Sequence, residues 1–470
     1  MANKGGRGAR AVVLGLGHFG GGEGAARFLA GRGWAVLVTD LKSADELARA
    51  IGRLSDLPIE YRLGGHRPED LLGADLVVVN PAVPRTAPIL GQARSAGVAL
   101  SSSMNLFLAL CPAPVAAVTG STGKSTTAAM LAGMLAQTGR RVHLGGNIGV
   151  SLLPVLDQMR PEDMVVLEIS CFQLEDAGCL PWSPSVAVVT NLTPNHLDRY
   201  GTPEAYAAAK RPIVGFQSRA DVAVLNHRDP VLRGWARTEV RGSLLLFDPL
   251  AGRGPLVTGT NLRCGRIVWN NGAGEQVICA REHVRLPGEH NVANAMAACA
   301  AARWLGTEAR QIREALCAFS GLEHRLEECG RFGGMKFYND SDATTPESTI
   351  AALRSFERPM TLIAGGYSKG LDLGPMAAAI AARADALVTI GHCGPELAQL
   401  SREAGLRRGK AAAIREAGSL GEAVRAAIEL SMPGSVILFS PGCASFDMFQ
   451  NFAERGLVFK ALVEEEGQRE

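Results

Sequence analysis

Residues 119–126 read TGSTGKST, a Gly-rich loop that ends in a lysine and two hydroxyl side chains. The loop follows the apolar run Val115–Thr119, which predicts a strand, and it leads into an apolar pattern that predicts a helix beginning at Lys124. In such a loop the backbone N–H groups and the helix N-terminus can surround a triphosphate, while Lys124 reaches the outer phosphates and Ser125 ligates Mg²⁺. Val118 stands where the general pattern has its first glycine, so the loop is a shortened variant. The predicted ATP-binding residues of the loop are Gly120, Ser121, Thr122, Gly123, Lys124, Ser125 and Thr126.

Three later side chains could add charge or metal ligands to such a site. Glu168 lies near the end of the predicted strand Met164–Ile169, where it could hold Mg²⁺ directly or through water. His196, in the segment NLTPNHLD, could ligate a metal, although a hydrogen-bonded loop histidine is equally typical. Lys210 ends the apolar stretch YAAAK, and on composition alone it is a surface lysine of a helix.

A second Gly-rich loop occurs earlier in the chain. Residues 15–20 read GLGHFG after the apolar run Arg10–Gly15, and Asp40 ends the predicted strand Ala35–Thr39. This G-x-G-x-x-G pattern is typical of dinucleotide-binding folds, in which the glycines let the backbone approach a diphosphate and the acid accepts a ribose hydroxyl. Taken alone, the pattern indicates an NAD-dependent dehydrogenase. UDP carries the same diphosphate, however, and a tight turn without a ligand fits as well.

Length and composition limit the possible classes of protein. The 470 residues are enough for about three domains. The net charge of +2 argues against a strongly basic nucleic-acid-binding protein. The 10 cysteines are scattered without a CxxC pair, which favours reduced thiols over a disulfide framework or a zinc site. The sequence contains no uncharged apolar run long enough to predict a membrane-spanning helix. The N-terminus does not resemble a signal peptide, so we expect a cytoplasmic protein.

Strands and helices alternate along the chain, which predicts an α/β protein with parallel sheets. Prolines after Cys111 and a glycine at position 321 suggest the boundaries of three domains. We expect a Rossmann-like domain over residues 1–111, a P-loop ATPase-like domain over 112–321 and a second Rossmann-like domain over 322–470.

Nine segments of the chain together resemble the Mur ligases, a family of ATP-dependent enzymes that add amino acids during peptidoglycan synthesis. They are TGSTGKST at 119–126, GGNIG at 145–149, EISCFQLE at 168–175, NLTPNHLDRY at 191–200, AAAK at 207–210, GEHNVANAMAA at 288–298, GLEHR at 321–325, NDSDATTPEST at 339–349 and SPGCASFDMFQNFAERG at 440–456. The resemblance covers nearly the whole chain.

The resemblance implies a reaction and its cofactors. The three domains would bind a UDP-sugar, ATP and the incoming amino acid in turn. ATP would phosphorylate the L-alanyl carboxylate of UDP-N-acetylmuramoyl-L-alanine (UDP-MurNAc-L-Ala), and the amine of glutamate, with D-glutamate favoured, would attack the acyl phosphate. One Mg²⁺ would lie near Ser125 and Glu168, and a second would be held by His196 and a carbamylated Lys210. The enzyme would act as a monomer.

The resemblance also implies a set of site residues. The catalytic residues would be Lys124, His196, Lys210, His324 and Arg325. Further nucleotide contacts would be Asn291, Asn294, Arg325 and Asp340. The UDP-sugar site would contain Gly15, Leu16, Gly17, His18, Asp40, Asn80 and Asn147. The amino-acid site would contain Thr344, Lys369, Ser445 and Phe452.

One departure from the family affects the amino-acid site. Glutamate ligases of the family commonly read NDSKATN, whereas residues 339–345 of this chain read NDSDATT, so Asp342 replaces a lysine. A similar segment occurs in divergent members that resemble L-glutamate-adding ligases, which leaves the choice between D- and L-glutamate open.

Three other functions remain as alternatives. A folylpolyglutamate-type ligase would share the ATPase core, but the N-terminal G-x-G segment and the C-terminal SPGCASFD segment argue against it. An NAD-dependent dehydrogenase would leave the GKST loop, Glu168, His196 and Lys210 without a role. A nucleotide-gated binding protein would need neither a carbamylated lysine nor an amino-acid pocket.

Overall fold

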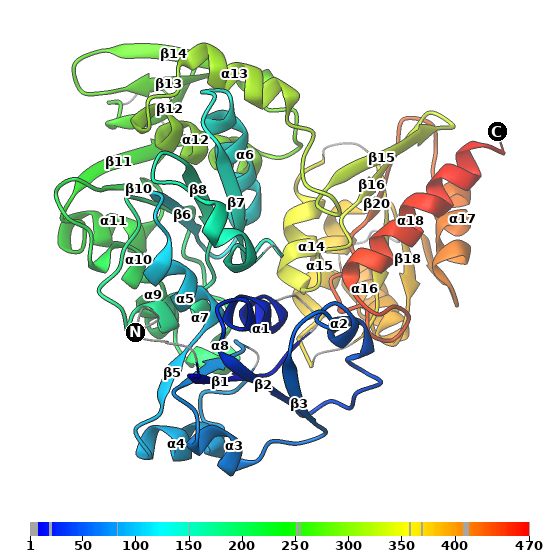
Figure 1. Ribbon diagram of the computed structural model, residues 1–470. Helices are drawn as coiled ribbons and strands as arrows, with labels where there is room; N and C mark the ends of the chain where they lie inside the picture. Colours follow the sequence, from blue (N-terminus) through cyan, green and yellow to red (C-terminus); the bar gives the residue numbers. More distant parts are fainter. Residues whose placement is uncertain are drawn as a thin grey trace. The chain divides into compact units, whose positions relative to one another are not determined.

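The computed structural model describes residues 8–17, 21–81, 83–149, 151–250, 252, 255–356, 359–367, 370–407 and 413–469. The chain forms two compact units (Figure 1). The first comprises residues 1–284 and 292–318, and the second comprises residues 285–291 and 319–470. Two sheets lie in the first unit and one in the second.

The N-terminal sheet is parallel and has the strand order β3-β2-β1-β4-β5. Its strands are β1 (Arg10–Leu14), β2 (Ala35–Asp40), β3 (Ile59–Leu63), β4 (Leu76–Val79) and β5 (Ala99–Ser101). Its helices are α1 (Gly21–Gly31), α2 (Ala48–Gly52), α3 (Pro68–Leu72), α4 (Pro88–Ser95) and α5 (Ser103–Leu110). Alternate strand residues face opposite sides, so Val13 packs in the cluster that contains α1 and Val12 in the cluster that contains α3 and α4. The strand order reverses beside β1, where ligands of such sheets commonly bind.

The central sheet has the order β14-β13-β12-β11-β10-β9-β6-β8-β7. Its strands are β6 (Val115–Thr119), β7 (Val142–Gly146), β8 (Met164–Glu168), β9 (Val186–Val189), β10 (Val222–Asn226), β11 (Ser243–Asp248), β12 (Gly259–Arg263), β13 (Arg266–Asn270) and β14 (Glu275–Ala280). The sheet is parallel from β7 to β12, and β13 and β14 add antiparallel strands at one edge.

Helices surround the central sheet and also connect its parallel strands. They are α6 (Lys124–Ala136), η2 (Leu153–Gln158), α7 (Cys171–Ala177), α8 (Leu197–Tyr200), α9 (Pro203–Lys210), α10 (Pro212–Gly215), α11 (Pro230–Thr238), η3 (Arg281–His283), α12 (Glu289–Trp304) and α13 (Ala309–Ala318). Helix α6 packs on β6, β7 and β8, with α13 beside it. The loop that begins α6 therefore lies at the carboxyl ends of the parallel strands.

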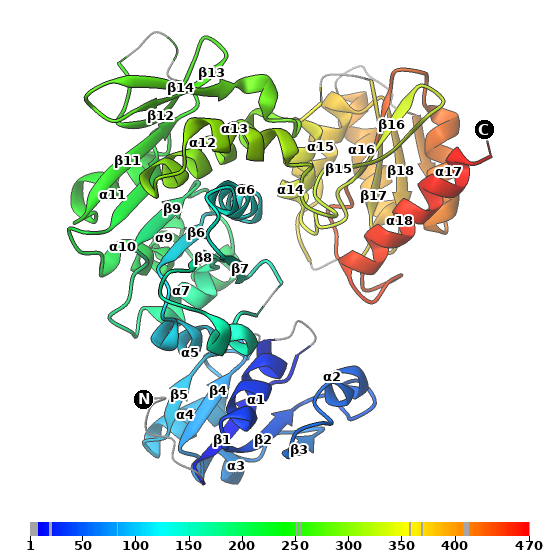
Figure 2. The same cartoon turned by 45° about the horizontal axis from the view of Figure 1, so that its top comes forward.

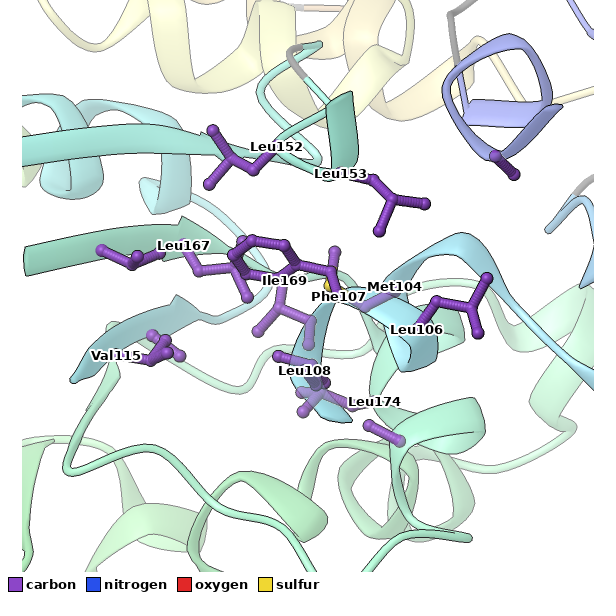
Figure 3. Close-up of a cluster of buried hydrophobic side chains, with 14 of the residues drawn as sticks. Met104, Leu106, Phe107, Leu108, Val115, Leu152, Leu153, Leu167, Ile169 and Leu174 are labelled. Carbon is purple, nitrogen blue, oxygen red and sulfur yellow. The ribbon is translucent and has the colours of Figure 1, made fainter. Parts of the chain in front are cut away.

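Helix α5 joins the N-terminal and central parts of the first unit. Figure 3 shows its side chains Met104, Leu106, Phe107 and Leu108 in one apolar cluster with residues of β6, η2, β8 and α7. The four side chains are buried. Burial of a side chain of this size contributes about 1.5–3 kcal/mol. The last helix of the expected N-terminal domain is therefore part of a core that it shares with the central sheet.

The second unit contains a sheet of order β15-β16-β20-β17-β18-β19, in which only the β15–β16 pair is antiparallel among the described strands. Its strands are β15 (Glu327–Phe332), β16 (Met335–Asn339), β17 (Met360–Gly365), β18 (Ala386–Ile390), β19 (Ala413–Glu416) and β20 (Val436–Phe439). Its helices are α14 (Pro346–Leu353), α15 (Gly374–Arg383), α16 (Gly394–Leu406), α17 (Leu420–Leu430) and α18 (Phe452–Gly467). Helices α14, α15 and α16 contribute to one apolar cluster and α17 and α18 to another, so both faces are covered (Figure 2).

The three α/β sheets, one parallel and two mainly parallel, confirm the predicted fold class. The strands predicted at Val115–Thr119, Met164–Ile169 and Ala35–Thr39 are present as β6, β8 and β2, and the helix predicted to begin at Lys124 is α6. The β15–β16 hairpin was not predicted, nor were β3 and β7. Among the described residues, no helix is both long and apolar enough to cross a membrane.

Candidate active site

The loop between β6 and α6 has the shape that its glycines require. Gly120 has a φ of +153° and Gly123 a φ of +81°. A Cβ atom on Gly120 would collide with Thr190 Oγ1, and one on Gly123 would collide with Asn294 Oδ1. The N-cap residue of α6 is Gly123, which has no side chain to cap the helix. Because the first backbone N–H groups of a helix lack partners within the helix, this end can bind an anion.

Asn191 and Thr193, on the segment that follows β9, hold the outer side of this loop. The backbone N–H of Thr122 donates to Asn191 Oδ1 at 3.0 Å, and that of Ser121 donates to the Asn191 carbonyl at 2.9 Å. Ser121 Oγ donates to the Thr193 carbonyl and accepts from the Thr193 N–H. The Nζ of Lys124 donates to the Ser121 carbonyl at 3.1 Å. The segment NLTP thus supports the loop, a role that the sequence analysis did not predict.

Glu168 is a buried carboxylate beside the strand that leads into the loop. It ends β8, where it pairs with Val118 of β6, and it is 1% exposed. Its Oε1 accepts from Asn147 Nδ2 at 2.8 Å, whereas Oε2 is buried and has no partner among the described residues. An unpaired buried carboxylate oxygen is costly without a cation or donor, so the site suits Mg²⁺.

Lys210 is a buried lysine at the end of α9, not the surface residue that composition alone suggests. It is 1% exposed, its Nζ donates to Thr119 Oγ1 at 3.3 Å, and the ammonium lies 5.0 Å from the centre of the Tyr206 ring. Burial, with a smaller contribution from the charge of Lys124, lowers the pKa of Lys210 to about 7. A substantial fraction of the amine is therefore neutral at neutral pH, the form that reacts with CO₂.

His196 lies beside Tyr206 of this cluster and is exposed. Its backbone φ is +52°, and its ring centre is 5.0 Å from that of Phe172 and 6.2 Å from that of Tyr206. The hydroxyl of Tyr206 donates to Ser121 Oγ at 3.1 Å, so Tyr206 connects the phosphate loop, His196 and Lys210. No group of three or more His, Cys, Asp or Glu side chains within the described ranges could hold a metal ion by itself.

The N-terminal Gly-rich loop is organised by Asp40. Its Oδ2 accepts the N–H of Leu16 at 2.8 Å and that of Gly17 at 3.4 Å, and its Oδ1 accepts the N–H of Lys42 at 3.0 Å. Asn80 donates from Nδ2 to the Gly15 carbonyl at 3.2 Å. The structure therefore brings these predicted UDP-sugar residues together. His18 lies outside the described residues, and Asn147 lies beside Glu168 in the central cluster.

The predicted nucleotide residues of the second unit surround the end of β16. Asp340 is buried, its Oδ1 accepts the Leu326 N–H at 3.2 Å, and its Oδ2 accepts Ser440 Oγ at 2.7 Å. Burial raises the pKa of Asp340 to about 7. Arg325 forms an ion pair with Asp342 at 2.5 Å, so the departure at position 342 supplies a partner for Arg325.

Asn291 and Asn294 are both buried near the start of α12. Asn291 Nδ2 donates to the Pro287 carbonyl at 2.7 Å, and Asn294 lies against Gly123. The division between the two units falls between these two asparagines.

The predicted amino-acid residues are only partly grouped. Thr344 lines a small cavity with Tyr367, Cys393 and Cys443. Ser445 is buried, and the Phe452 ring lies edge-on to the His324 ring, with the two centres 6.3 Å apart. Lys369 lies outside the described residues.

A P-loop domain that stands in chain order between two Rossmann-like domains, with a buried carboxylate and a buried lysine beside the loop, defines an ATP-dependent peptide ligase. Sequence models of three domains match this chain: the Mur ligase MurD-like N-terminal domain over residues 9–102, the Mur ligase middle domain over 118–302 and the Mur ligase glutamate ligase domain over 324–443. The chain belongs to the Mur ligase family.

Individual relatives extend over nearly the full length. The UDP-N-acetylmuramoylalanine–D-glutamate ligase of a Roseiflexus species is 40% identical over 461 residues, which cover 97% of this chain and 98% of that protein. The ligase of the same name from Symbiobacterium thermophilum is 40% identical over 455 residues, with the same coverage of both chains. The solved structure of the UDP-N-acetylmuramate–alanine ligase from Thermotoga maritima is similar with a TM-score of 0.63 at 21% identity, covering 98% of this chain and 99% of that one.

Proposed function

We propose that the protein is the ligase that adds glutamate to UDP-N-acetylmuramoyl-L-alanine at the expense of ATP, with D-glutamate as the favoured amino acid. The observation that carries the proposal is the cluster of Lys124, Glu168 and Lys210 at the phosphate loop, in a chain that matches D-glutamate ligases over nearly its full length. Residues 1–111, 112–321 and 322–470 would act as the UDP-sugar, ATP and amino-acid domains of a cytoplasmic, monomeric enzyme.

The first step would form an acyl phosphate. The L-alanyl carboxylate attacks the γ-phosphorus of ATP, the bond to the β-phosphate oxygen breaks, and ADP leaves. Negative charge on the transferred group needs fixed donors and cations. Lys124 and the first N–H groups of α6 would supply them on the phosphate side. Asp40 and Asn80 hydrogen-bond to the N-terminal loop and would hold it in the shape that binds the UDP diphosphate.

The second step would form the amide. The neutral amine of glutamate attacks the acyl carbon, and the tetrahedral intermediate expels inorganic phosphate while the amine loses a proton. Thr344, Ser445 and Phe452 would orient glutamate, and Lys369 would pair with one of its carboxylates. His324 and Arg325 would contact the phosphates.

Two Mg²⁺ sites fit the donor set of the central domain. Ser125 and Glu168 would hold one ion, and the unpaired Oε2 of Glu168 supports that assignment. His196 and a carbamate on Lys210 would hold the other, and the lowered pKa of Lys210 favours carbamate formation. When bound, the ions supply Lewis-acid stabilisation of the phosphoryl charge.

The test is ATP-dependent phosphate release with UDP-MurNAc-L-Ala as acceptor, measured in parallel with D-glutamate, L-glutamate and no amino acid. We expect release with D-glutamate and a product one glutamyl residue heavier than the acceptor. Preference for L-glutamate would reverse the stereochemical assignment and leave the ligase assignment intact. Release with a folate acceptor and none with the UDP-sugar would contradict the proposal.

A further inference from the structure

Residues of β15, β16 and α18 in the second unit surround the imidazole of His324. His324 is 4% exposed and has a backbone φ of +63°. We propose that Asn339, at the end of β16, is a positioning residue that keeps His324 in the tautomer protonated on Nε2, so that Nε2–H donates to an anionic phosphoryl oxygen. The identity of that ligand rests on the proposed function, whereas the tautomer rests on the geometry of this unit alone.

The orientation of the Asn339 amide follows from its neighbours. The backbone N–H of Ser341 donates to Asn339 Oδ1 at 3.2 Å. A backbone N–H can only donate, so the amide oxygen must face it. On the other side, Nδ2 lies 3.2 Å from the Glu327 carboxylate and 3.3 Å from the Gly456 carbonyl. Both groups act as acceptors there, so the partners on both sides of the amide require the same orientation.

The amide orientation decides the protonation of His324. Asn339 Nδ2 lies 2.9 Å from His324 Nδ1. Because an amide nitrogen only donates, Nδ1 must accept and carries no proton in this arrangement. The neutral imidazole then has its proton on Nε2. A proton on Nδ1 would point at the N–H of Asn339, and the nearest carboxylate oxygen, Glu327 Oε2, is 3.9 Å from Nδ1, beyond hydrogen-bond distance.

The charges around the ring are consistent with a neutral imidazole. Burial lowers the pKa of His324. Glu323, Glu327 and Asp342 oppose this shift, and Lys460, which is paired with Glu323 and Glu327, adds to it. Desolvation is the largest of these effects, so His324 is expected to be neutral near pH 7.

The ring is also fixed in place by packing and by its own backbone. A Cβ atom on Gly456 of α18 would collide with His324 Nδ1, so only glycine leaves room for the ring there. The His324 N–H donates to Glu327 Oε2 at 2.9 Å, and its carbonyl accepts from the Asp342 N–H at 3.1 Å. No hydrogen bond within the described part of the chain uses Nε2, which leaves that nitrogen available to a ligand.

In phosphoryl transfer, the tautomer with the proton on Nε2 can donate a hydrogen bond to the transferred group. A donor placed toward an anionic oxygen stabilises it, whereas the lone pair of the other tautomer would repel it. Positioning residues of this kind act through the group that they orient, as hydrogen-bond partners of metal-bound histidines do.

The tautomer can be measured directly on the full-length, ligand-free protein. Histidine labelled with ¹⁵N gives long-range ¹H–¹⁵N correlations that distinguish the two tautomers and the imidazolium, and His324→Gln identifies the His324 signals among those of the 9 histidines. We expect Nε2–H in the wild type. In Asn339→Asp, the carboxylate accepts from Nδ1–H, and we expect the Nδ1–H tautomer or the imidazolium. Nδ1–H in the wild type, or an unchanged signal in Asn339→Asp, would overturn the proposal.

An activity arm separates positioning from folding. Asn339→Asp is expected to lower kcat about a hundredfold, as the loss of one aligned donor does, with a smaller change in the KM for ATP. Asn261→Asp is the matched control, since Asn261 is equally buried in the other unit and its side chain, among the residues that the structure describes, bonds only to the backbone of Val257. We expect that control to lose stability without changing the His324 signals or kcat.

The two proposals can fail separately. Wild-type Nε2–H without any acceptor-dependent phosphate release would refute the proposed function and leave the tautomer assignment standing. Glutamate-dependent release with Nδ1–H at His324 would refute the role of Asn339 alone. If Asn339→Asp does not fold, the tautomer measured in the wild type still supports or overturns the proposal.

Discussion

The two Gly-rich loops of the first unit are similar in sequence. They differ in whether a carboxylate of the protein accepts hydrogen bonds from the N–H groups of the loop. In the N-terminal loop, the N–H groups of Leu16 and Gly17 donate to the carboxylate of Asp40. In the central loop, Asn191 accepts the N–H of Thr122, and Gly123, the N-cap residue of α6, makes no side-chain capping hydrogen bond. A carboxylate of the chain itself therefore stabilises the first loop, whereas we expect the helix N-terminus at the second loop to bind an anionic ligand.

The difference limits what a glycine pattern can predict. Both loops follow a buried parallel strand and precede a helix, and both contain glycines with positive φ. The carboxylate at the end of β2 and the lysine at the start of α6 set them apart. We therefore expect substitutions in the central loop to affect catalysis strongly and substitutions in the N-terminal loop to affect mainly substrate binding.

The largest expected effect is at Lys124. Lys124→Ala removes the cation at the phosphates and should lower kcat at least about a hundredfold, as the loss of one electrostatic stabiliser does. Substrate-dependent phosphate release measures it. Arg140→Ala, which removes an exposed positive charge just beyond the far end of α6, should retain wild-type turnover. Turnover near wild type in Lys124→Ala would contradict the assignment of the loop.

Lys210→Ala should be nearly as inactive, because the second metal ion would lose a ligand. Formate or acetate could fill the vacant position and restore part of the activity. The same carboxylates should leave Lys124→Ala unchanged, which makes that variant the control. An unmodified amine at Lys210 in the active, metal-loaded enzyme, seen by mass spectrometry under non-acidic conditions, would rule out the carbamate.

Carbamate formation at Lys210 should be favoured above the pKa of this buried lysine, where its amine is neutral. Below its pKa of about 7, Lys210 is an ammonium and cannot attack CO₂; above it, the amine is neutral. At matched concentrations of dissolved CO₂, activity in CO₂-depleted buffer should therefore recover faster at pH 8 than at pH 6. The amount of bicarbonate added is set separately at each pH, because the CO₂ fraction of a given total falls as the pH rises. The same shift means that the unfolded chain binds more protons here between pH about 7 and 10.5, so the contribution of Lys210 to the free energy of unfolding rises with pH in that window. Equal recovery at both values of pH would contradict this account.

A smaller effect is expected in the N-terminal loop. Asp40→Ala leaves the N–H groups of Leu16 and Gly17 without their carboxylate, at a cost of about 1–3 kcal/mol. We expect a higher KM for the UDP-sugar, a lower melting temperature and little change in the KM for ATP. Asp45→Ala, on the exposed segment that follows β2, is the control. A large loss of kcat with an unchanged KM for the UDP-sugar would contradict the expectation that the N-terminal loop acts mainly in substrate binding.

The smallest effect is expected at Asp342. Asp342→Lys replaces the partner of Arg325 with a like charge and restores the residue that the family commonly has. Arg325 is 44% exposed, so the pair itself contributes only about 0–1 kcal/mol. We expect a few-fold change in the KM for glutamate and none for the UDP-sugar. Asp342→Asn separates loss of the ion pair from charge reversal, and a changed UDP-sugar KM would contradict the expectation.

Local sequence was sufficient to predict the phosphate loop, because its glycines, lysine and flanking strand and helix are contiguous. It was not sufficient for Asn191, Tyr206 or Asn339, whose partners lie 69, 85 and 15 residues away along the chain. Composition favoured a surface position for Lys210, since the burial of a helix lysine depends on what packs over it. The β15–β16 hairpin was missed because its strands alternate buried and exposed residues only weakly.

Gly456 carries a thermodynamic consequence for this enzyme. A glycine inside a helix costs about 0.5–1 kcal/mol relative to alanine, because its backbone loses more freedom on folding. At most helix positions, replacement by alanine would recover that stability. In α18 the added methyl group would enter the space of the His324 ring. The glycine therefore lowers the stability of the helix but leaves room for the His324 ring. We expect thermostabilised variants of this enzyme to keep glycine at this position.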